Sequence, residues 1–371
     1  MASSAVKERN TSLDLIRTIA ILLVIVNHAV EHTFGFDLDY MYSLPAYVRV
    51  LALAGFTLGR IGVPLFLMLT GYLLLTREYD LAGIKSFYKK NLLPLFITWE
   101  IWVLLYNIYA CLYYHTGFDL KIYFKEALFL KRVEIHPTIH HTWFVPVILG
   151  IYLFIPLVAK VLHSIDWKVL LFLVLVVFVF CFVIPSANLL KLAQNTSEGG
   201  QYLSQLNLYF SGGNYGLYLI AGYCAKKKSE LIQKLLRRKI ICSAAILALV
   251  ILFAITVAVQ FYFFGKGYRY LVWYTFFTMP LIGALLFCLL AQIRPGKVLG
   301  TIVVPVSLSA FGIYLIHELI VIPAADLLGP HLGNLAEIII LTVGAFLISF
   351  ILVELISRIP HVGKTLFFRK R

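Results

Sequence analysis

The chain alternates between long apolar runs and short polar segments. A transmembrane helix needs about 20 mostly apolar residues. Ten runs have this character, at 13–30, 57–76, 92–114, 143–162, 167–186, 207–225, 240–264, 271–292, 298–322 and 335–356. Around the start of the second run, Gly55, Gly59, Gly62 and Pro64 predict a broken entry from the outer side. The pattern therefore predicts an all-α polytopic membrane protein with about ten transmembrane helices.

The basic residues predict how these helices are oriented, because cytoplasmic segments of membrane proteins carry an excess of Lys and Arg. With the N-terminus inside, the inner segments hold 22 basic residues and the outer segments hold 8. We therefore expect both termini to be cytoplasmic. The predicted domains are a cytoplasmic tail at 1–12, a transmembrane domain at 13–357 and a basic cytoplasmic tail at 358–371.

The composition excludes several classes of protein. Hydrophobic residues make up 61% of the chain and charged residues 13%, with a mean hydropathy of +0.89. A soluble domain is about a quarter charged, so a soluble enzyme, a disordered regulator and a collagen-like fibre are excluded. The net charge of +14 follows mostly from topology, and we expect no nucleic acid partner.

Ionisable side chains inside a membrane are costly, and each one is a functional candidate. We single out seven in the predicted spans: Arg17, His28, Arg60, Glu100, His317, Glu318 and Glu354.

Arg17 and His28 share the first span and lie eleven residues apart. Eleven helical steps return to within about 20° of the starting direction and rise about 16 Å. Both side chains therefore lie on one face, which Glu31 and His32 extend outward. A cation near the cytoplasmic surface and an imidazole farther along suit a long anionic ligand. The alternative is a snorkelling arginine and a histidine that bonds to a neighbouring helix.

Several segments, in the same order along the chain, resemble the membrane-bound acyltransferase 3 family. The first is Ser12 to Arg17 with Asn27-His28, which fits the family's spacing of a basic residue, ten residues and a histidine. The others are Arg60 to Phe66 with Thr70-Gly71-Tyr72, Phe87 to Lys90 before Leu93-Pro94, His141 to Phe144 followed by Tyr152 to Leu157, Tyr215 to Tyr223, and Ser307 to His317. Thr70 stands where serine is usual, and Asn91 where arginine is often found.

The resemblance covers roughly residues 10–357 and implies a single ten-helix membrane domain. It implies O-acylation, commonly O-acetylation, of a hydroxyl on an extracytoplasmic glycan, a cell-envelope polymer, a lipid-linked sugar or a small molecule. The implied donor is cytoplasmic acyl-CoA, a co-substrate, so we expect no permanently bound cofactor. The expected partners are this donor, the hydroxyl acceptor and membrane lipid. The expected location is a cell membrane, and we favour the plasma membrane of a bacterium.

Acyl transfer to an alcohol needs a base for the hydroxyl. We predict His28 as the catalytic residue, because its unperturbed pKa is the nearest to neutrality. A covalent acyl group on His28 is an open alternative. Arg17 is predicted to hold the CoA phosphates or to orient the pantetheine arm. Lys85, Lys89 and Lys90, in a predicted inner loop, are candidate partners of the nucleotide phosphates, and the alternative is that they only set the topology.

Four further residues are candidates for binding the acceptor or the oxyanion: Arg60, His141, Trp143 and His317. Arg60 is expected to start the second span on the outer side. Each of three candidates also has a structural explanation. Arg60 could form a structural ion pair, Trp143 could anchor the helix at the membrane interface, and His317 could form a hydrogen bond between helices. Glu318 and Glu354 are equally well explained as counter-ions.

Two other functions fit part of the pattern. A transporter or flippase for a lipid-linked sugar also needs buried charges, but the stripe of Arg17 and His28 beside a basic loop suits CoA better. A catalytically inactive sensor or assembly subunit would have no need of both residues. No ligand spacing recurs among His28, His32, His140 and His141, so we expect no metal site.

Overall fold

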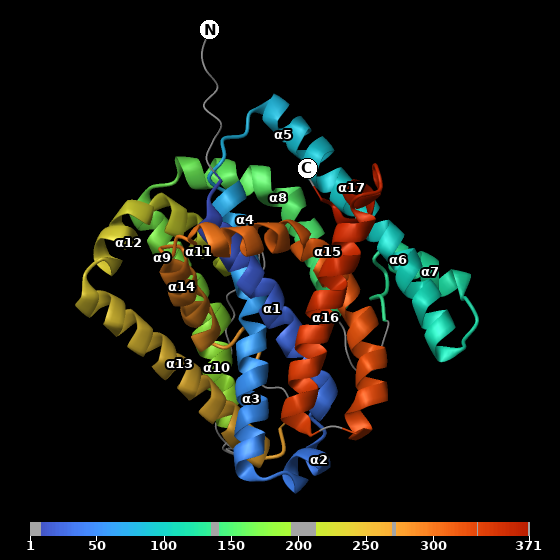
Figure 1. The fold of residues 1–371 in the computed structure, drawn as a ribbon. Coiled ribbons are helices and arrows are strands. Elements are labelled where there is room, and N and C mark those ends of the chain that lie inside the picture. The colour runs from blue at the N-terminus through green and yellow to red at the C-terminus, as the bar shows by residue number, and fades with distance from the viewer. Residues whose placement is uncertain (1–8, 135–140, 194–212, 269–271, 332, 370–371) are drawn as a thin grey trace.

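The fold is helical throughout the residues described by the computed structural model, which are 9–134, 141–193, 213–268, 272–331 and 333–369. Figure 1 shows these helices gathered into one bundle. The α-helices are α1 (Thr11–Phe34), α2 (Leu38–Ser43), α3 (Ala46–Arg60), α4 (Gly62–Leu74), α5 (Leu81–Phe87), α6 (Leu93–Tyr114), α7 (Leu120–Ala127), α8 (Phe144–Ser164), α9 (Trp167–Phe178), α10 (Ile184–Ala193), α11 (Gly213–Lys227), α12 (Ser229–Leu236), α13 (Lys239–Gly265), α14 (Thr278–Leu290), α15 (Lys297–Leu328), α16 (Asn334–Ile356) and α17 (Val362–Phe367).

Within the described residues, eight helical segments are long and apolar enough to cross a membrane. They are Thr11–Phe34, Ala46–Leu74, Leu81–Tyr114, His141–Ser164, Trp167–Leu192, Lys239–Gly265, Lys297–Leu328 and Asn334–Ile356. The predicted sixth span falls on α11, and its residues 207–212 lie outside the described part of the chain. The predicted eighth span falls on α14, an apolar helix of 13 residues. The prediction of an all-α polytopic membrane protein is confirmed.

Helix α1 lies at the centre of the bundle, packed against α3, α4, α15 and α16. In its most apolar stretch 72% of the residues are buried, against 11% for α13. The exposed side chains of α13 are mostly aliphatic, as Leu247 and Val250 illustrate. Exposed aliphatic side chains are what a lipid-facing helix presents. Ionisable side chains on α1 therefore lie inside protein rather than in lipid.

The start of α1 and the C-terminal helix α17 lie at the same end of the bundle, and α2 lies at the opposite end (Figure 1). Part of the predicted basic tail is folded against the bundle. Trp102 Nε1 donates to the carbonyl of Leu366 at 2.7 Å, and Phe367 is only 2% exposed. That both ends are cytoplasmic stays a prediction.

The second membrane segment begins earlier than predicted. It runs from Ala46 to Leu74 and is interrupted at Ile61, between α3 and α4. Pro64 has no N–H to donate to the carbonyl of Arg60, which explains the interruption. The prediction that Arg60 starts this span was wrong, because the apolar residues 50–56 continue the helix outward. Arg60 ends α3 at the middle of the segment.

The predicted inner loop with three lysines is helical. Lys85 lies in α5, and Lys89 and Lys90 lie in a π-helical turn, Tyr88–Leu92, that joins α5 to α6. All three lysines are exposed. Because hydrogen bonds continue from α5 through this turn into α6, the basic residues are held on a helix that extends the third span at its N-terminal end.

Helices α4 and α11 approach each other closely through two glycines. A Cβ atom added to Gly71 would lie 1.9 Å from the carbonyl oxygen of Leu219, and one added to Gly222 would lie 2.0 Å from that of Met68. Small residues allow such approach, and packing of this kind associates helices in membranes. The two glycines therefore set the separation of α4 and α11.

Gly71→Ala is expected to destabilise the protein by about 1–3 kcal/mol, because the new methyl group overlaps a backbone carbonyl that cannot move independently. The measurement is the midpoint of thermal unfolding in detergent. Gly150→Ala is the control, because a Cβ atom at Gly150 in α8 meets nothing within 4 Å and alanine favours a helix. Equal midpoints for the two variants would contradict the close packing of α4 and α11.

Candidate active site

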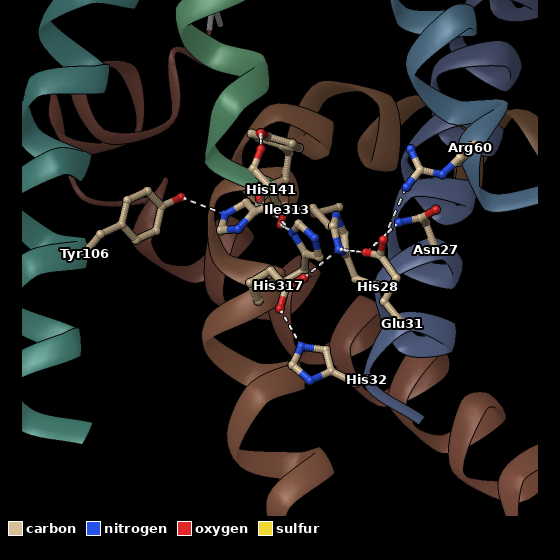
Figure 2. Close-up of polar contacts among 11 residues, drawn as sticks. Asn27, His28, Glu31, His32, Arg60, Tyr106, His141, Ile313 and His317 are labelled. Atoms are coloured by element: carbon tan, nitrogen blue, oxygen red, sulfur yellow. Dashed lines mark hydrogen bonds and ion pairs between the residues drawn. The ribbon is translucent and has the colours of Figure 1, made fainter. Parts of the chain in front are cut away.

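Three buried histidines from different parts of the chain meet beside α1. They are His28 of α1, His141 of the 3₁₀ turn before α8, and His317 of α15. The ring centroids are 5.3 Å apart for His28 and His317, 5.3 Å for His141 and His317, and 6.0 Å for His28 and His141. Figure 2 shows the three rings around one point. The fold thus joins three predicted site residues in one cluster.

The Nδ1 atom of His28 lies between two carboxylates. It is 2.9 Å from Glu318 Oε1 and 3.0 Å from Glu31 Oε2, and neither oxygen lies in line with the ring N–H. A lone pair on Nδ1 would be repelled by both oxygens, so Nδ1 carries a proton that the two share. In the neutral ring the lone pair is then on Nε2. This tautomer is the one that can accept a proton on the side away from the carboxylates.

Glu318 also binds a second histidine of α1. Its Oε2 atom accepts a hydrogen bond from His32 Nε2 at 3.1 Å, and its side chain is fully buried. His28 and His32 lie one helical turn apart, so both face α15. The carboxylate therefore bridges two α1 histidines, and the contact at Oε1 fixes the proton of His28.

Glu31 is held from the side opposite His28. Asn27 Nδ2 donates to its Oε2 at 2.9 Å, and Arg60 Nη2 lies 3.4 Å from its Oε1. The Arg60 guanidinium lies over the rings of Trp273 and Phe56, at 3.7 Å and 4.1 Å from their centroids. Such placement is a favourable cation–π arrangement. The structure therefore places Arg60 as the counter-ion of Glu31, and a direct role toward acceptor or oxyanion stays a prediction.

His141 and His317 present lone pairs toward the cluster. The Tyr106 hydroxyl donates to the carbonyl of Leu315 at 2.8 Å, so His141 Nε2, 3.3 Å from that hydroxyl, is the donor to it. His317 Nδ1 donates to the carbonyl of Tyr314 at 2.7 Å.

The other ring atoms, His141 Nδ1 and His317 Nε2, are buried and bond to none of the residues that the structure describes. In these tautomers both are hydrogen-bond acceptors. They suit the hydroxyl groups of a ligand rather than an oxyanion.

An aromatic wall lies next to the histidines. Trp143 stacks on Tyr215 with centroids 5.7 Å apart and packs against Tyr274 at 5.6 Å. Tyr274 also lies 5.4 Å from the Arg60 guanidinium. Trp143 is only partly buried. The wall therefore joins two of the predicted acceptor-binding residues, Trp143 and Arg60, through a tyrosine that the sequence did not single out.

Arg17 lies along the same face of α1 as His28, as predicted. Its Nη1 atom donates to Ser307 Oγ of α15 at 2.7 Å, and Ser307 Oγ donates to Asp14 at 2.6 Å. The residue numbers of Arg17 and Ser307 differ by 290, the same offset as for His28 and Glu318. Equal offsets mean that α1 and α15 run parallel in one register. The side chain of Arg17 stays 28% exposed.

The three lysines are not brought to Arg17 by any contact among the described residues. Lys89 instead lines an apolar groove of about 440 Å³ with Tyr88, Phe96 and Leu153. Glu354 lies away from the histidines, bonded to Ser309 at 2.6 Å and to Arg369 at 2.8 Å. It is a counter-ion for the C-terminal segment.

The spacing of the cluster would also admit a metal ion, since His28, His317 and Glu318 each offer a ligand atom within 4.8 Å of the others. However, both oxygens of Glu318 already contact histidines, and Nδ1 of His28 carries a proton. A metal ion would have to displace these contacts, so we interpret the cluster as a proton-transfer network. His140 lies outside the described residues.

Comparison with known proteins identifies the family. The chain matches the family profile described as an acyltransferase domain over residues 10–354, nearly its whole length. No curated protein and no solved structure matches the chain. The matched region contains every helix of the histidine cluster and each motif on which the resemblance was based. The chain therefore belongs to the acyltransferase 3 family of integral membrane acyltransferases.

Proposed function

We propose that this membrane acyltransferase transfers an acyl group, in the first instance acetyl, from cytoplasmic acyl-CoA to a hydroxyl of an extracytoplasmic glycan, cell-envelope polymer or lipid-linked sugar. The observation that carries the proposal is the contact of His28 Nδ1 with Glu318. A carboxylate that holds one ring nitrogen in its protonated form makes the other a base. The side chain of His28 remains 11% exposed, whereas that of Glu318 is fully buried.

The reaction follows from this tautomer. His28 Nε2 takes the proton of the acceptor hydroxyl as its oxygen attacks the thioester carbonyl. A C–O bond forms, the carbonyl electrons move to the oxygen, and collapse of the tetrahedral intermediate breaks the C–S bond. The proton passes from His28 to the sulfur, so CoA leaves as a thiol. Glu318 stabilises the imidazolium that exists between these two transfers, and that imidazolium is a positive charge close to the oxyanion.

The donor side is supported by the parallel register of α1 and α15. Arg17 and His28 both face α15 and are separated by about 16 Å along α1, comparable to the length of the pantetheine arm. A partly exposed arginine can bind phosphate oxygens with its free donors. The nucleotide would then stay at the cytoplasmic end while the thioester reaches His28.

The acceptor side of the proposal is supported by the aromatic wall and by two buried histidine nitrogens that have no hydrogen-bond donor among the described residues. His141 Nδ1 and His317 Nε2 can each accept a hydrogen bond from a hydroxyl. Trp143 offers a flat apolar surface beside them. Several hydroxyls next to an apolar ring face describe a sugar, which is why we favour a glycan over a simple alcohol.

His28→Asn is expected to lower the acceptor-dependent release of CoA from acetyl-CoA by about 10²–10⁴-fold, the usual contribution of a general base. The assay follows free thiol from purified protein in detergent with a cell-envelope glycan extract. His163→Asn is the control, because His163, near the end of α8, contacts the carbonyl of Leu75 and none of the three clustered histidines among the described residues. If wild type releases no CoA, the donor assignment fails and the transporter alternative gains weight. Release without acceptor would indicate an acyl-enzyme or hydrolysis.

Glu318→Gln is expected to lower kcat by about 10²–10⁴-fold and to leave KM for acetyl-CoA nearly unchanged. The amide keeps the shape of the side chain but no longer fixes the proton on His28 Nδ1, and the loss of that tautomer is costly. The measurement is steady-state kinetics at saturating acceptor, on protein whose folded fraction is checked by gel filtration. A variant that is less stable but has wild-type kcat would assign Glu318 a structural role only.

Arg17→Gln is expected to raise KM for acetyl-CoA about tenfold or more with a smaller effect on kcat, because a charge-assisted contact to the donor is lost. Acetyl-CoA is compared with S-acetyl-pantetheine, which lacks the nucleotide. A rise in KM for acetyl-CoA alone means that Arg17 binds the nucleotide phosphates. A rise for both donors means that it orients the pantetheine arm, and a rise for neither removes Arg17 from the donor site.

A further inference from the structure

The groove that Lys89 lines is a second concave feature of the protein, apart from the histidine cluster. It lies between the third and fourth membrane segments and has a volume of about 440 Å³, which is within the range of small-molecule sites. Its lining comes from the π-helical turn, from α6, from α8 and from the chain after α7, and none of the described residues that line it belongs to the histidine cluster. The side chains on which the argument depends are Tyr88, Lys89, Leu93, Phe96, Phe129 and Leu153.

Two contacts between elements bound the groove along about two helical turns. The Tyr88 hydroxyl donates to the carbonyl of Leu153 at 2.8 Å, which ties the π-helical turn to α8. Phe129 packs against Phe96 with ring centroids 6.3 Å apart. Tyr88 and Phe96 are eight residues apart, a rise of about 12 Å. The groove is therefore long and narrow, and it runs along the membrane segments.

The groove opens toward the bilayer. Leu149 is only 6% exposed, whereas Leu93 and Leu153 are each 51% exposed. Both leucines lie in segments that are long and apolar enough to cross a membrane, and exposed aliphatic side chains of such segments face lipid. A void beside them would forfeit dispersion contacts. An apolar chain that enters from the bilayer is therefore the occupant that this lining favours.

Lys89 places a positive charge at the start of this apolar groove. Its side chain is exposed and forms no ion pair or hydrogen bond with any residue that the structure describes. An ammonium group has three hydrogen-bond donors and no acceptor, so it suits an anion. Lys85 and Lys90 are exposed in the adjoining turns. Basic residues next to a membrane helix attract anionic lipid headgroups.

We propose that the groove binds an acyl chain of an anionic phospholipid and that Lys89 binds the phosphate of that lipid. A phospholipid has the two chemical features of the site, a long chain without polar groups and an adjacent negative charge. The inference is independent of the acyl-CoA reaction. It gives Lys89 a ligand other than the nucleotide phosphates that the sequence predicted.

The lining distinguishes a lipid from two other occupants. The pantetheine arm of CoA contains amides, and an amide without a hydrogen-bond partner is costly to place among apolar side chains. A helix of a partner protein needs a far larger surface, since a stable interface buries about 800 Å² on each partner. An acyl chain fits a narrow groove of two turns and needs no hydrogen bond from it.

Lys89→Gln tests the contact to the headgroup. The protein in detergent is titrated with phosphatidylglycerol or with phosphatidylcholine of the same chains, and bound lipid is measured by native mass spectrometry. We expect wild type to bind phosphatidylglycerol about fivefold more tightly, the effect of one lysine on an anionic headgroup, and Lys89→Gln to lose this preference. Lys234→Gln, which removes an exposed lysine from α12, should keep it. No preference in wild type, or an equal loss in both variants, would overturn the proposal.

Leu153→Trp tests the groove itself, because the indole occupies space in it while the backbone carbonyl of residue 153 stays available to Tyr88. Binding of both lipids should weaken about tenfold or more, the equivalent of about two methylene groups that are no longer buried. Leu157→Trp is the control, since Leu157 lies one turn later on α8, is 59% exposed and does not line the groove. The thermal midpoints without lipid show whether both variants are folded. Unchanged lipid binding in folded Leu153→Trp would overturn the proposal.

A phosphatidylglycerol with a diazirine in its acyl chain locates the bound lipid without any substitution. Its cross-links should map to peptides that contain Leu93, Phe129 or Leu153. Cross-links spread equally over α13 would overturn the proposal. So would labelling that palmitoyl-CoA displaces more readily than unlabelled phosphatidylglycerol does, because the groove would then bind acyl-CoA. None of these readouts requires turnover of acetyl-CoA, so a failure of the proposed reaction leaves them unchanged.

Discussion

A carboxylate inside a membrane protein must be paired, and the pairing of Glu318 determines how the central helices fit together. An unpaired buried charge is strongly destabilising. Glu318 is fully buried on α15, and both of its oxygens contact histidines of α1. These contacts form only when α1 and α15 lie side by side at one register. The requirement to satisfy one charge thus fixes the position of the proposed base.

The same register recurs near the start of α1. Arg17 binds Ser307 there, and the offset between partners equals that of His28 and Glu318. A shift of α15 along α1 by one turn would break both sets of contacts at once. Close packing elsewhere reinforces this arrangement, since Gly62 of α4 has no room for a Cβ atom beside the backbone of Ala20. Polar contacts and small residues therefore hold α1 rigidly between its neighbours, as a precise proton-transfer geometry requires.

The sequence predicted those features that depend on the periodicity of one helix. The apolar runs located most of the membrane segments, and the eleven-residue spacing correctly placed Arg17 and His28 on one face. Periodicity does not indicate which helix lies opposite that face. The sequence alone therefore could not identify Glu318, rather than another acidic residue, as the partner of His28. The tautomers of His141 and His317 depend on Tyr106 and on a backbone carbonyl, and no local pattern reveals such contacts.

The position of Arg60 within its membrane segment was predicted wrongly for a related reason. The predicted span began near residue 57, with the glycines and Pro64 interpreted as a broken entry, whereas the helix begins at Ala46, continues through Gly55 and Gly59 and is interrupted at Ile61. In the middle of a membrane segment, a guanidinium needs a carboxylate partner and side chains that shield it from lipid. Glu31 is the partner of Arg60, and the rings of Phe56 and Trp273 lie against its guanidinium. Arg60 thereby neutralises the second carboxylate beside His28. Of the two roles predicted for Arg60, a contact to the substrate or a structural ion pair, the structure shows the ion pair.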